Sequence, residues 1–296
     1  MRQYTKEVIK KIIPEYILQV RRNYLANKRH REGPKRRKLL KFEMHLADHC
    51  NLNCKGCNHF SPLVVKEKFL DAGIFKKDCE RIAGLSGGLL EGIRFMGGEL
   101  LLHKNVVDIL NTGRKYFPKA TLDIVTNGIL LPKQPKEFWE TCGKNGIHIH
   151  ISKYPIKINN DEIDGLARQY NVKILRLSAN TGLQWHEMKL DVKGGQNMEE
   201  NFRLCPQANN CINLYEGKLY TCPTIAYIQY LNEYHGENFV VTEEDYIDIY
   251  KARSMDEILD FLCKPVQFCR YCDIKKWNAT VEWGVSKKER KEWIEE

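Results

Sequence analysis

Between residues 41 and 177 the sequence alternates strand-like segments with helix-like segments. Phe42, Met44 and Leu46 alternate with polar residues, which is the two-residue period of a strand buried on one face. The strand-like segments are 42–46, 91–96, 121–125, 147–152 and 172–177, and the helix-like segments are 72–84, 104–116, 135–142 and 160–170. Repeated strand–helix units of this length predict a parallel sheet covered by helices.

The length of this region limits the architecture. Five units precede residue 180, and the irregular stretch 181–204 is a candidate for a sixth. A closed eight-stranded barrel takes about 250 residues. We therefore expect an α/β fold, with a partial (β/α)6 TIM-like barrel at 41–204 and a C-terminal cysteine-rich domain at 205–296 built from a β-hairpin and a helix.

Residues 1–40 form a strongly basic N-terminal segment. The first 41 residues contain 14 Lys or Arg and three Glu, a net charge of +11, so the remainder sums to −2. Apolar residues at 6–25 have the spacing of an amphipathic helix. A basic amphipathic helix suits the surface of an anionic membrane, and a helix packed on the body or a solvated tail is the alternative. The −2 balance of the body argues against a specific nucleic-acid site.

The sequence indicates a cytoplasmic protein. No apolar run approaches the roughly 20 residues that span a bilayer, and the N-terminus lacks the pattern of a secretory signal. The basic segment adds the expectation of peripheral contact with the inner face of the membrane.

Eleven cysteines are many for a cytoplasmic chain, and clustered cysteines in a reducing compartment more often bind metal than form disulfides. Cys50, Cys54 and Cys57 form C-x3-C-x2-C directly after the first strand. Three thiolates leave one iron of a [4Fe–4S] cluster without a protein ligand, and that iron is free to bind a cofactor. A zinc site is the alternative, although a closed structural zinc site needs four ligands.

This cysteine loop, in its place after the first strand, resembles the radical S-adenosylmethionine (radical SAM) superfamily, and the resemblance covers residues 41–180. It implies a [4Fe–4S] cluster that binds SAM and receives an electron from a flavodoxin or ferredoxin-like donor. It also implies cleavage of SAM to methionine and a 5′-deoxyadenosyl radical, which removes a hydrogen atom from the substrate.

Residues after the next strands extend the resemblance. Gly97, Gly98 and Glu99 are similar to the GGE motif that meets the amino group of SAM in that family. Asn127, in a Thr-Asn-Gly sequence after the third strand, and Ser152, at the end of the fourth, are further implied contacts to SAM. An ordinary strand-end serine is the alternative for Ser152.

One position departs from the family pattern. The family often has an aromatic residue directly before the third cysteine, and here that residue is Gly56. Phe60 or His59 is then the candidate face for stacking on adenine, and simple packing is the alternative for Phe60.

A second set of cysteines lies in the last third of the chain. Eleven residues separate Cys205 from Gly217, and four separate Gly217 from Cys222, a spacing that resembles the opening of SPASM and twitch domains. The resemblance implies a β-hairpin and an auxiliary [4Fe–4S] cluster. The implied ligands are Cys205, Cys222, Cys269 and Cys272. Four cysteines also suit structural zinc, which is the alternative.

Cys211 and Cys263 are then spare, and either is able to replace a ligand. If the reaction is an epimerisation, they are the candidate hydrogen-atom donors. Structural roles are the alternative for both, and for the histidines near strand ends, among them His148 and His150. Ser286 and Glu289 match a capping box for a final helix.

The resemblance implies a radical SAM oxidoreductase or epimerase. We expect a sugar-like or nucleotide-like small polar substrate, or a lipid-linked glycan, in cell-envelope polysaccharide synthesis. A radical SAM peptide maturase, forming a thioether or epimerising a residue, is one alternative. A zinc or iron–sulfur binding module without activity is the other.

Overall fold

The computed structural model describes residues 33–177 and 184–295. The amphipathic helix expected at 6–25, and its contact with a membrane, lie outside the described residues. No described helix combines the length and the hydrophobicity needed to cross a bilayer.

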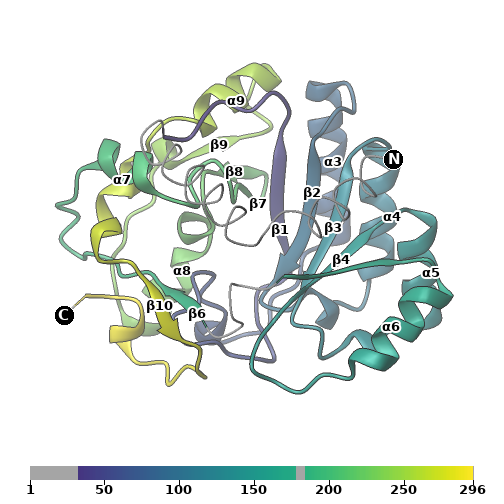
Figure 1. Cartoon of the computed structure of the whole chain (residues 1–296). Coiled ribbons are helices and arrows are strands. Elements are labelled where there is room, and N and C mark those ends of the chain that lie inside the picture. Colours follow the sequence, from purple (N-terminus) through teal and green to yellow (C-terminus); the bar gives the residue numbers. More distant parts are fainter. Residues whose placement is uncertain (1–32, 178–183, 296) are drawn as a thin grey trace, which may run out of the picture.

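Five parallel strands form the centre of the molecule (Figure 1), in the order β5-β4-β3-β2-β1. They are β1 (Lys41–Ala47), β2 (Gly92–Gly97), β3 (Thr121–Thr126), β4 (His148–Ser152) and β5 (Lys173–Leu177). The connecting helices are α3 (Ala72–Ser86), α4 (Val106–Tyr116), α5 (Lys136–Lys144) and α6 (Asn160–Gln169). Every strand and helix expected in this region is confirmed, with boundaries within two residues.

The two faces of the parallel sheet differ in polarity because successive side chains of a strand point to opposite faces. Phe42, Phe95 and Ile124 are fully buried in the apolar core shared with the helices. Alternate residues form a polar row across the other face, where Glu43 aligns with Arg94, Arg94 with Asp123, and Asp123 with His148.

A hairpin extends the same sheet beyond β1. Its strands are β7 (Asn213–Tyr215) and β8 (Lys218–Tyr220), and β9 (Tyr246–Asp248) follows on the outside. Glu216 and Gly217 turn the chain with φ of 49° and 73°, the left-handed pair that a two-residue hairpin turn requires. The expected hairpin is therefore present, and Glu43 N binds Ile212 O (2.7 Å) where it joins β1.

The structure differs from the expected (β/α)6 arrangement at the sixth strand. β6 (Gln184–Glu187) does not join the parallel sheet and pairs antiparallel with β10 (Asn278–Glu282) in a separate two-stranded ribbon. The parallel part of the sheet thus has five described strands. The reason is competition: a segment nearly one hundred residues later supplies the backbone partners of β6.

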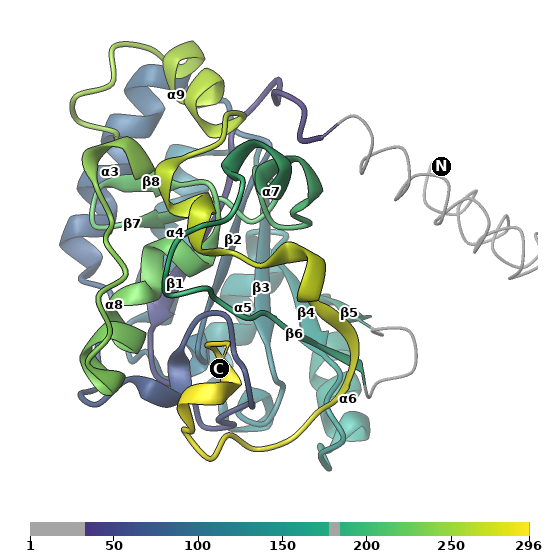
Figure 2. The ribbon, with the colours of Figure 1, turned by 90° about the vertical axis from the view of Figure 1, so that its left-hand side faces the viewer.

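The C-terminal third adds α7 (Met198–Leu204), α8 (Pro223–His235) and α9 (Met255–Leu262). Short 3-10 turns occupy Ser61–Leu63, Leu100–Leu102, Leu131–Lys133, Glu243–Asp245, Gln267–Tyr271, Ile274–Lys276 and Arg290–Glu292. α8 and the β6–β10 ribbon lie on the side of the sheet opposite α4, α5 and α6 (Figures 1 and 2). The polar face of the sheet therefore looks toward the C-terminal third of the chain.

The prediction of a final helix after Ser286 is wrong. Only the 3-10 turn Arg290–Glu292 forms there, with a capping box between Glu289 and Glu292. Ser286 Oγ (2.7 Å) and Lys287 N (2.8 Å) also donate hydrogen bonds to the Glu292 carboxylate. These bonds fold the segment back on itself, so its polar groups are satisfied without a longer helix.

Candidate functional site

Cys50, Cys54 and Cys57 line one cavity of about 140 Å³ beside the carboxyl ends of β2, β3 and β4. We call it the thiol cavity. Its other lining residues are Leu52, Asn58, His59, Ser61, Pro62, Met96, Gly97, Gly98, Val125, Thr126, Asn127, Ser152 and Tyr154. The structure thus brings together the three cysteines, both glycines, the asparagine and the strand-end serine expected from the sequence.

The three cysteines are shielded from solvent in a way that suits metal ligation, since Cys54 is buried and Cys50 and Cys57 are partly buried. Burial raises the pKa of Cys50 to about 11 and that of Cys54 to about 12, and the neighbouring sulfurs add to both shifts. Grouped buried thiolates need positive charge between them, and iron supplies it when metal binding displaces the thiol protons. The donor set therefore fits three irons of a [4Fe–4S] cluster.

Gly97 and Gly98 allow the end of β2 to pass directly against the end of β1. A Cβ on Gly97 would lie 2.2 Å from Ala47 O, and one on Gly98 would lie 2.3 Å from His49 O. Gly98 N binds Ala47 O (2.9 Å). The glycines are thus required where the backbone of β2 meets the start of the cysteine loop.

Glu99 lies beneath the cavity, and its side chain is engaged by the protein. The residue is 1% exposed, and its carboxylate accepts hydrogen bonds from Thr126 Oγ1 (2.8 Å), Asn127 N (3.0 Å) and Leu101 N (3.1 Å). Burial raises the pKa of Glu99, and these three bonds act in the opposite direction. In this structure the carboxylate joins the ends of β2 and β3, and Gly97 and Gly98 line the cavity in its place.

Asn127 connects the end of β3 to the cysteine loop. Its Nδ2 donates to Asn51 Oδ1 (2.8 Å), and its Oδ1 accepts from Ile129 N (3.0 Å). The second bond holds the side chain in one orientation. Asn127 therefore positions residue 51, which directly follows the first cysteine.

The structure does not place Phe60 where the expected adenine contact requires it. Its ring is 1% exposed and packs with Leu63, Tyr227 and Trp293 in a second apolar core, away from the cavity lining. His59 lines the cavity instead. Burial and the neighbouring His45 hold the pKa of His59 well below its usual range, so its ring is neutral.

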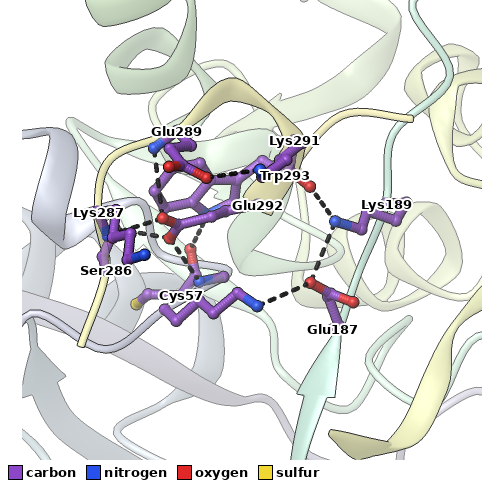
Figure 3. Close-up of polar contacts among 11 residues, drawn as sticks. Cys57, Glu187, Lys189, Ser286, Lys287, Glu289, Lys291, Glu292 and Trp293 are labelled. Atoms are coloured by element: carbon purple, nitrogen blue, oxygen red, sulfur yellow. Dashed lines mark hydrogen bonds and ion pairs between the residues drawn. The ribbon is translucent and has the colours of Figure 1, made fainter. Parts of the chain in front are cut away.

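The segment at the C-terminus holds the cysteine loop by its backbone (Figure 3). Trp293 Nε1 donates to Cys57 O (2.8 Å), and Gly56 N donates to Glu292 Oε2 (3.4 Å). Lys55 N also binds a backbone oxygen of this segment, at Gly284 (2.8 Å). The last residues of the chain therefore help to shape the first cysteine site.

A separate cleft of about 670 Å³ adjoins the loop at Lys55, and we call it the lysine cleft. Glu187 lies between Lys189 (3.1 Å) and Lys55 (4.0 Å) in this cleft (Figure 3). Its other lining residues are Lys276, Val285, Lys287, Glu289, Lys291, Glu292, Ile294 and Glu295. It shares no lining residue with the thiol cavity.

Cys205, Cys222, Cys269 and Cys272 line a second, smaller cavity beside α7 and the 3-10 turn Gln267–Tyr271. Burial raises the pKa of Cys222 and Cys272 well above the usual range, and the other cysteines of the group raise it further. The four sulfurs expected together are thus close enough to interact. Four thiols fit one closed iron–sulfur or zinc site.

Cys211 and Cys263 lie outside both cavities, so the expected hydrogen-donor role has no support from position. Cys263 ends α9, and its Sγ donates to Asp260 O (3.4 Å) on the same helix. Cys211 begins the turn before β7, where its backbone N binds Gln207 O (2.8 Å). Neither thiol reaches the lining of the thiol cavity.

Tyr154 and Trp283 are among the residues of the site that sequence reasoning missed. Tyr154 lines the thiol cavity, and Trp283 Nε1 donates to Cys54 Sγ (3.2 Å). Tyr154 follows Ser152 by two residues, so its place after β4 was a usable signal. Trp283 gives no such signal, because it meets Cys54 only through tertiary structure.

Curated relatives match part of this chain. A GTP 3',8-cyclase of Paenarthrobacter nicotinovorans is 31% identical over 100 residues, covering 33% of this chain and 28% of that protein. An S-adenosylmethionine-dependent nucleotide dehydratase of Selenomonas ruminantium is 32% identical over 113 residues, covering 37% of this chain and 38% of that protein. Over the matched part, the chain is similar to radical SAM enzymes. It spans about a third of the length of the curated relatives it matches.

The remaining comparisons do not extend this similarity. No model of a known protein family matches the chain. The solved structure of BtrN in complex with AdoMet and 2-DOIA has a TM-score of 0.48 at 16% identity, covering 88% of this chain and 99% of that one. We draw no conclusion from a likeness of that size. The thiol cavity contains the cysteines, the two glycines, Asn127 and Ser152 that the resemblance assigns to the [4Fe–4S] cluster and SAM.

Proposed function

We propose that this chain is a radical SAM enzyme that cleaves SAM reductively and removes a hydrogen atom from a small polar, sugar-like or nucleotide-like substrate. The observation that carries the proposal is the convergence of Cys50, Cys54 and Cys57 with Gly97 and Gly98 in one cavity. When bound there, the [4Fe–4S] cluster supplies the electron that cleaves SAM.

The protein's own residues position the two cofactors. The three cysteines would hold the cluster and leave one iron free for the methionine end of SAM. Gly97 and Gly98 present backbone at the cavity, where side chains would block a close approach. Asn127, Ser152 and Tyr154 supply polar groups to the lining of the same cavity.

The polar face of the sheet supports a polar substrate. Glu43, Arg94, Asp123, His148 and His150 place charged or hydrogen-bonding groups on the face that looks toward the C-terminal third. Such a face is better matched by the hydrogen-bonding groups of a polar substrate than by an apolar one. The two relatives are named as a GTP 3',8-cyclase and a nucleotide dehydratase, which favours a nucleotide-like substrate. A lipid-linked glycan of cell-envelope polysaccharide synthesis is a further candidate of the same polarity.

The second cysteine site favours oxidation as the outcome. We assign Cys205, Cys222, Cys269 and Cys272 to an auxiliary [4Fe–4S] cluster, which is able to accept an electron from a substrate radical. Epimerisation instead requires a hydrogen-atom donor, and no cysteine other than the three loop cysteines lines the described part of the thiol cavity.

The lysine cleft is the proposed docking site for an acidic one-electron donor of the flavodoxin or ferredoxin type. Lys55 lies between two cluster cysteines and lines this cleft, so a donor seated there is close to the loop that holds the cluster. Lys287 and Lys291 are exposed at its edge. Complementary charge speeds the encounter of two proteins and makes the rate sensitive to salt.

Anaerobic reconstitution with iron and sulfide, followed by SAM and dithionite, tests the proposal. We expect 5′-deoxyadenosine from the native chain and none from Cys54→Ala, with Cys263→Ala as the matched control that retains cleavage. Cleavage of SAM by Cys54→Ala overturns the assignment of this loop. Zinc in place of iron at Cys50, Cys54 and Cys57 indicates the binding module instead, and turnover of a peptide but no small molecule indicates a maturase.

A further inference from the structure

Asp123, His148 and His150 form a cluster on the polar face of the sheet, and none of them lines either cysteine cavity. Asp123 lies on β3, and the two histidines occupy alternate positions of β4, so all three point to the same side. Asp123 Oδ1 lies 3.4 Å from His148 Nδ1 and 3.3 Å from His150 Nε2. One donor atom from each residue falls within 4.8 Å of the others.

Two of the three residues have buried polar atoms without a hydrogen bond within the described parts of the chain. The Asp123 side chain is 6% exposed, yet its Oδ1 makes no hydrogen bond there, and neither ring nitrogen of His150 makes one. A buried carboxylate oxygen without a hydrogen bond costs about 1–3 kcal/mol or more. The arrangement therefore calls for a further partner placed among these atoms.

We propose that Asp123, His148 and His150 bind one divalent transition-metal ion. Two imidazoles and one carboxylate form a three-ligand set that leaves coordination positions open for water or substrate. Ligands about 2.1 Å from a metal in a tetrahedral site lie about 3.4 Å from one another. The two Asp123 contacts already have nearly this length.

Nearby charges indicate which metals fit. Arg94, on the neighbouring strand, is paired with Glu43 (2.6 Å), so its charge is compensated. Lys41 and Lys173 remain as flanking cations that weaken a purely electrostatic site. Zn²⁺, Fe²⁺ or Co²⁺, which bond well to imidazole, are therefore favoured over Mg²⁺ and Ca²⁺, which prefer oxygen ligands.

The place of the cluster on its strands suggests a role. Val125 and Ser152 follow Asp123 and His150 by two residues on the same face, and both line the thiol cavity. Two residues of a strand span about 7 Å. If the proposed radical chemistry holds, the metal's open positions suit a hydroxyl or phosphate oxygen of a substrate whose other end reaches the cavity. Binding of the ion itself does not depend on that chemistry.

Zinc binding to the reconstituted holoprotein tests the proposal, because both cysteine sites then carry iron and are closed to zinc. After incubation with ZnCl₂ and desalting, elemental analysis and zinc X-ray absorption report stoichiometry and ligands. We expect about one zinc per chain with nitrogen and oxygen ligands and no sulfur. His150→Ala and Asp123→Asn should each raise the zinc Kd at least about tenfold.

His235→Ala is the matched control, since His235 Nε2 also lacks a hydrogen bond in the described chain but belongs to no three-residue cluster. It should retain zinc. Iron content and the melting temperature show whether each variant is folded, and the isosteric Asp123→Asn decides the matter if His150→Ala is not. No zinc in the native holoprotein overturns the proposal. So does zinc that has sulfur ligands or that persists in folded Asp123→Asn.

Discussion

Trp283 Nε1 donates a hydrogen bond of 3.2 Å to Cys54 Sγ, across 229 positions of sequence. The bond belongs to a wider contact, because Cys54 also forms a β-bridge with Val285. The Trp283 ring lies 6.0 Å from the Tyr154 ring, on the wall of the thiol cavity. The C-terminal segment therefore sets part of the electrostatic environment of Cys54, a proposed cluster ligand.

Replacing Trp283 by Phe should lower the midpoint potential of the cluster at Cys50–Cys57. A hydrogen bond to a ligating sulfur stabilises the reduced cluster, and its loss is worth on the order of tens of mV. Redox titration followed by electron paramagnetic resonance measures the change. Trp139→Phe is the control, because its ring is buried in the main core and its Nε1 makes no hydrogen bond in the described chain. Equal potentials for Trp283→Phe and the native chain would contradict the prediction.

Gly98→Ala should impair the thiol cavity. The new Cβ would lie 2.3 Å from His49 O, so the end of β2 and the cysteine loop must separate. We expect loss of most SAM binding, measured by calorimetry on the reconstituted protein. Gly84→Ala is the contrasting change, because a Cβ at Gly84 in α3 meets nothing within 4 Å. It should stabilise the helix by about 0.5–1 kcal/mol and leave SAM binding intact. Normal SAM affinity in Gly98→Ala would show that the close approach is unnecessary.

Cys269→Ala should remove the auxiliary cluster and leave the first one in place. Iron content should fall from about eight to about four per chain, because each [4Fe–4S] cluster holds four irons. SAM cleavage should persist while product formation is lost, as 5′-deoxyadenosine and product assays measure. Cys263→Ala, outside both cavities, should keep the native iron content. Native iron and turnover in Cys269→Ala would exclude this residue as a ligand.

Arg94→Met should destabilise the fold by about 2–4 kcal/mol, because it leaves the buried Glu43 carboxylate unpaired. Burial already raises the pKa of Glu43, and Arg94 opposes that rise. Without Arg94 the folded pKa rises further above the unfolded one. Stability is then lost as pH rises through the folded value, so the deficit should be larger at pH 8 than at pH 5.

Thermal unfolding at the two pH values measures the effect. Arg253→Met supplies the comparison, because it removes the exposed pair with Glu257 and should cost about 0.5 kcal/mol or less. A deficit for Arg94→Met that shrinks at high pH would show that Glu43 does not carry the uncompensated charge.

Lys287→Glu combined with Lys291→Glu should slow reduction of the cluster by a flavodoxin or ferredoxin. Reversing two charges at the lysine cleft weakens the attraction of an acidic donor, and an effect of about tenfold at low salt is expected. Stopped-flow absorbance measures the rate. Reduction by dithionite, a small reductant, should be unchanged, and Lys136→Glu on α5 serves as the surface control. A double variant with native rates would move donor docking to another face.

Local patterns predicted the parallel sheet well. The period of two in β1 and the helical periods of α3–α6 follow from which side chains each element buries, so neighbouring residues carried the information. The Glu216–Gly217 turn was predictable for the same reason, because left-handed backbone favours a few residue types. The four cysteines of the second site came from spacing that resembles a known family, and the structure brings them together.

The elements that failed depend on distant partners. β6 pairs with β10 and not with β5, and the Ser286–Glu289 segment turns back through Glu292 and forms no helix. Phe60 was predicted to stack on adenine, but its ring packs against α8 and Trp293. In each case a contact across more than five residues outweighed the local preference.

The sequence by itself determined the cysteine spacing, the five parallel strands with their four connecting helices, and the glycines that resemble the radical SAM pattern. Tertiary structure decided that Trp283 faces Cys54 and that Asp123 meets two histidines of the next strand. It also decided that Glu99 binds the ends of strands. The physical reason is that periodicity records only whether a side chain is buried, whereas a hydrogen bond or a ligand set requires atoms from separate segments to arrive within about 3.5 Å of one another.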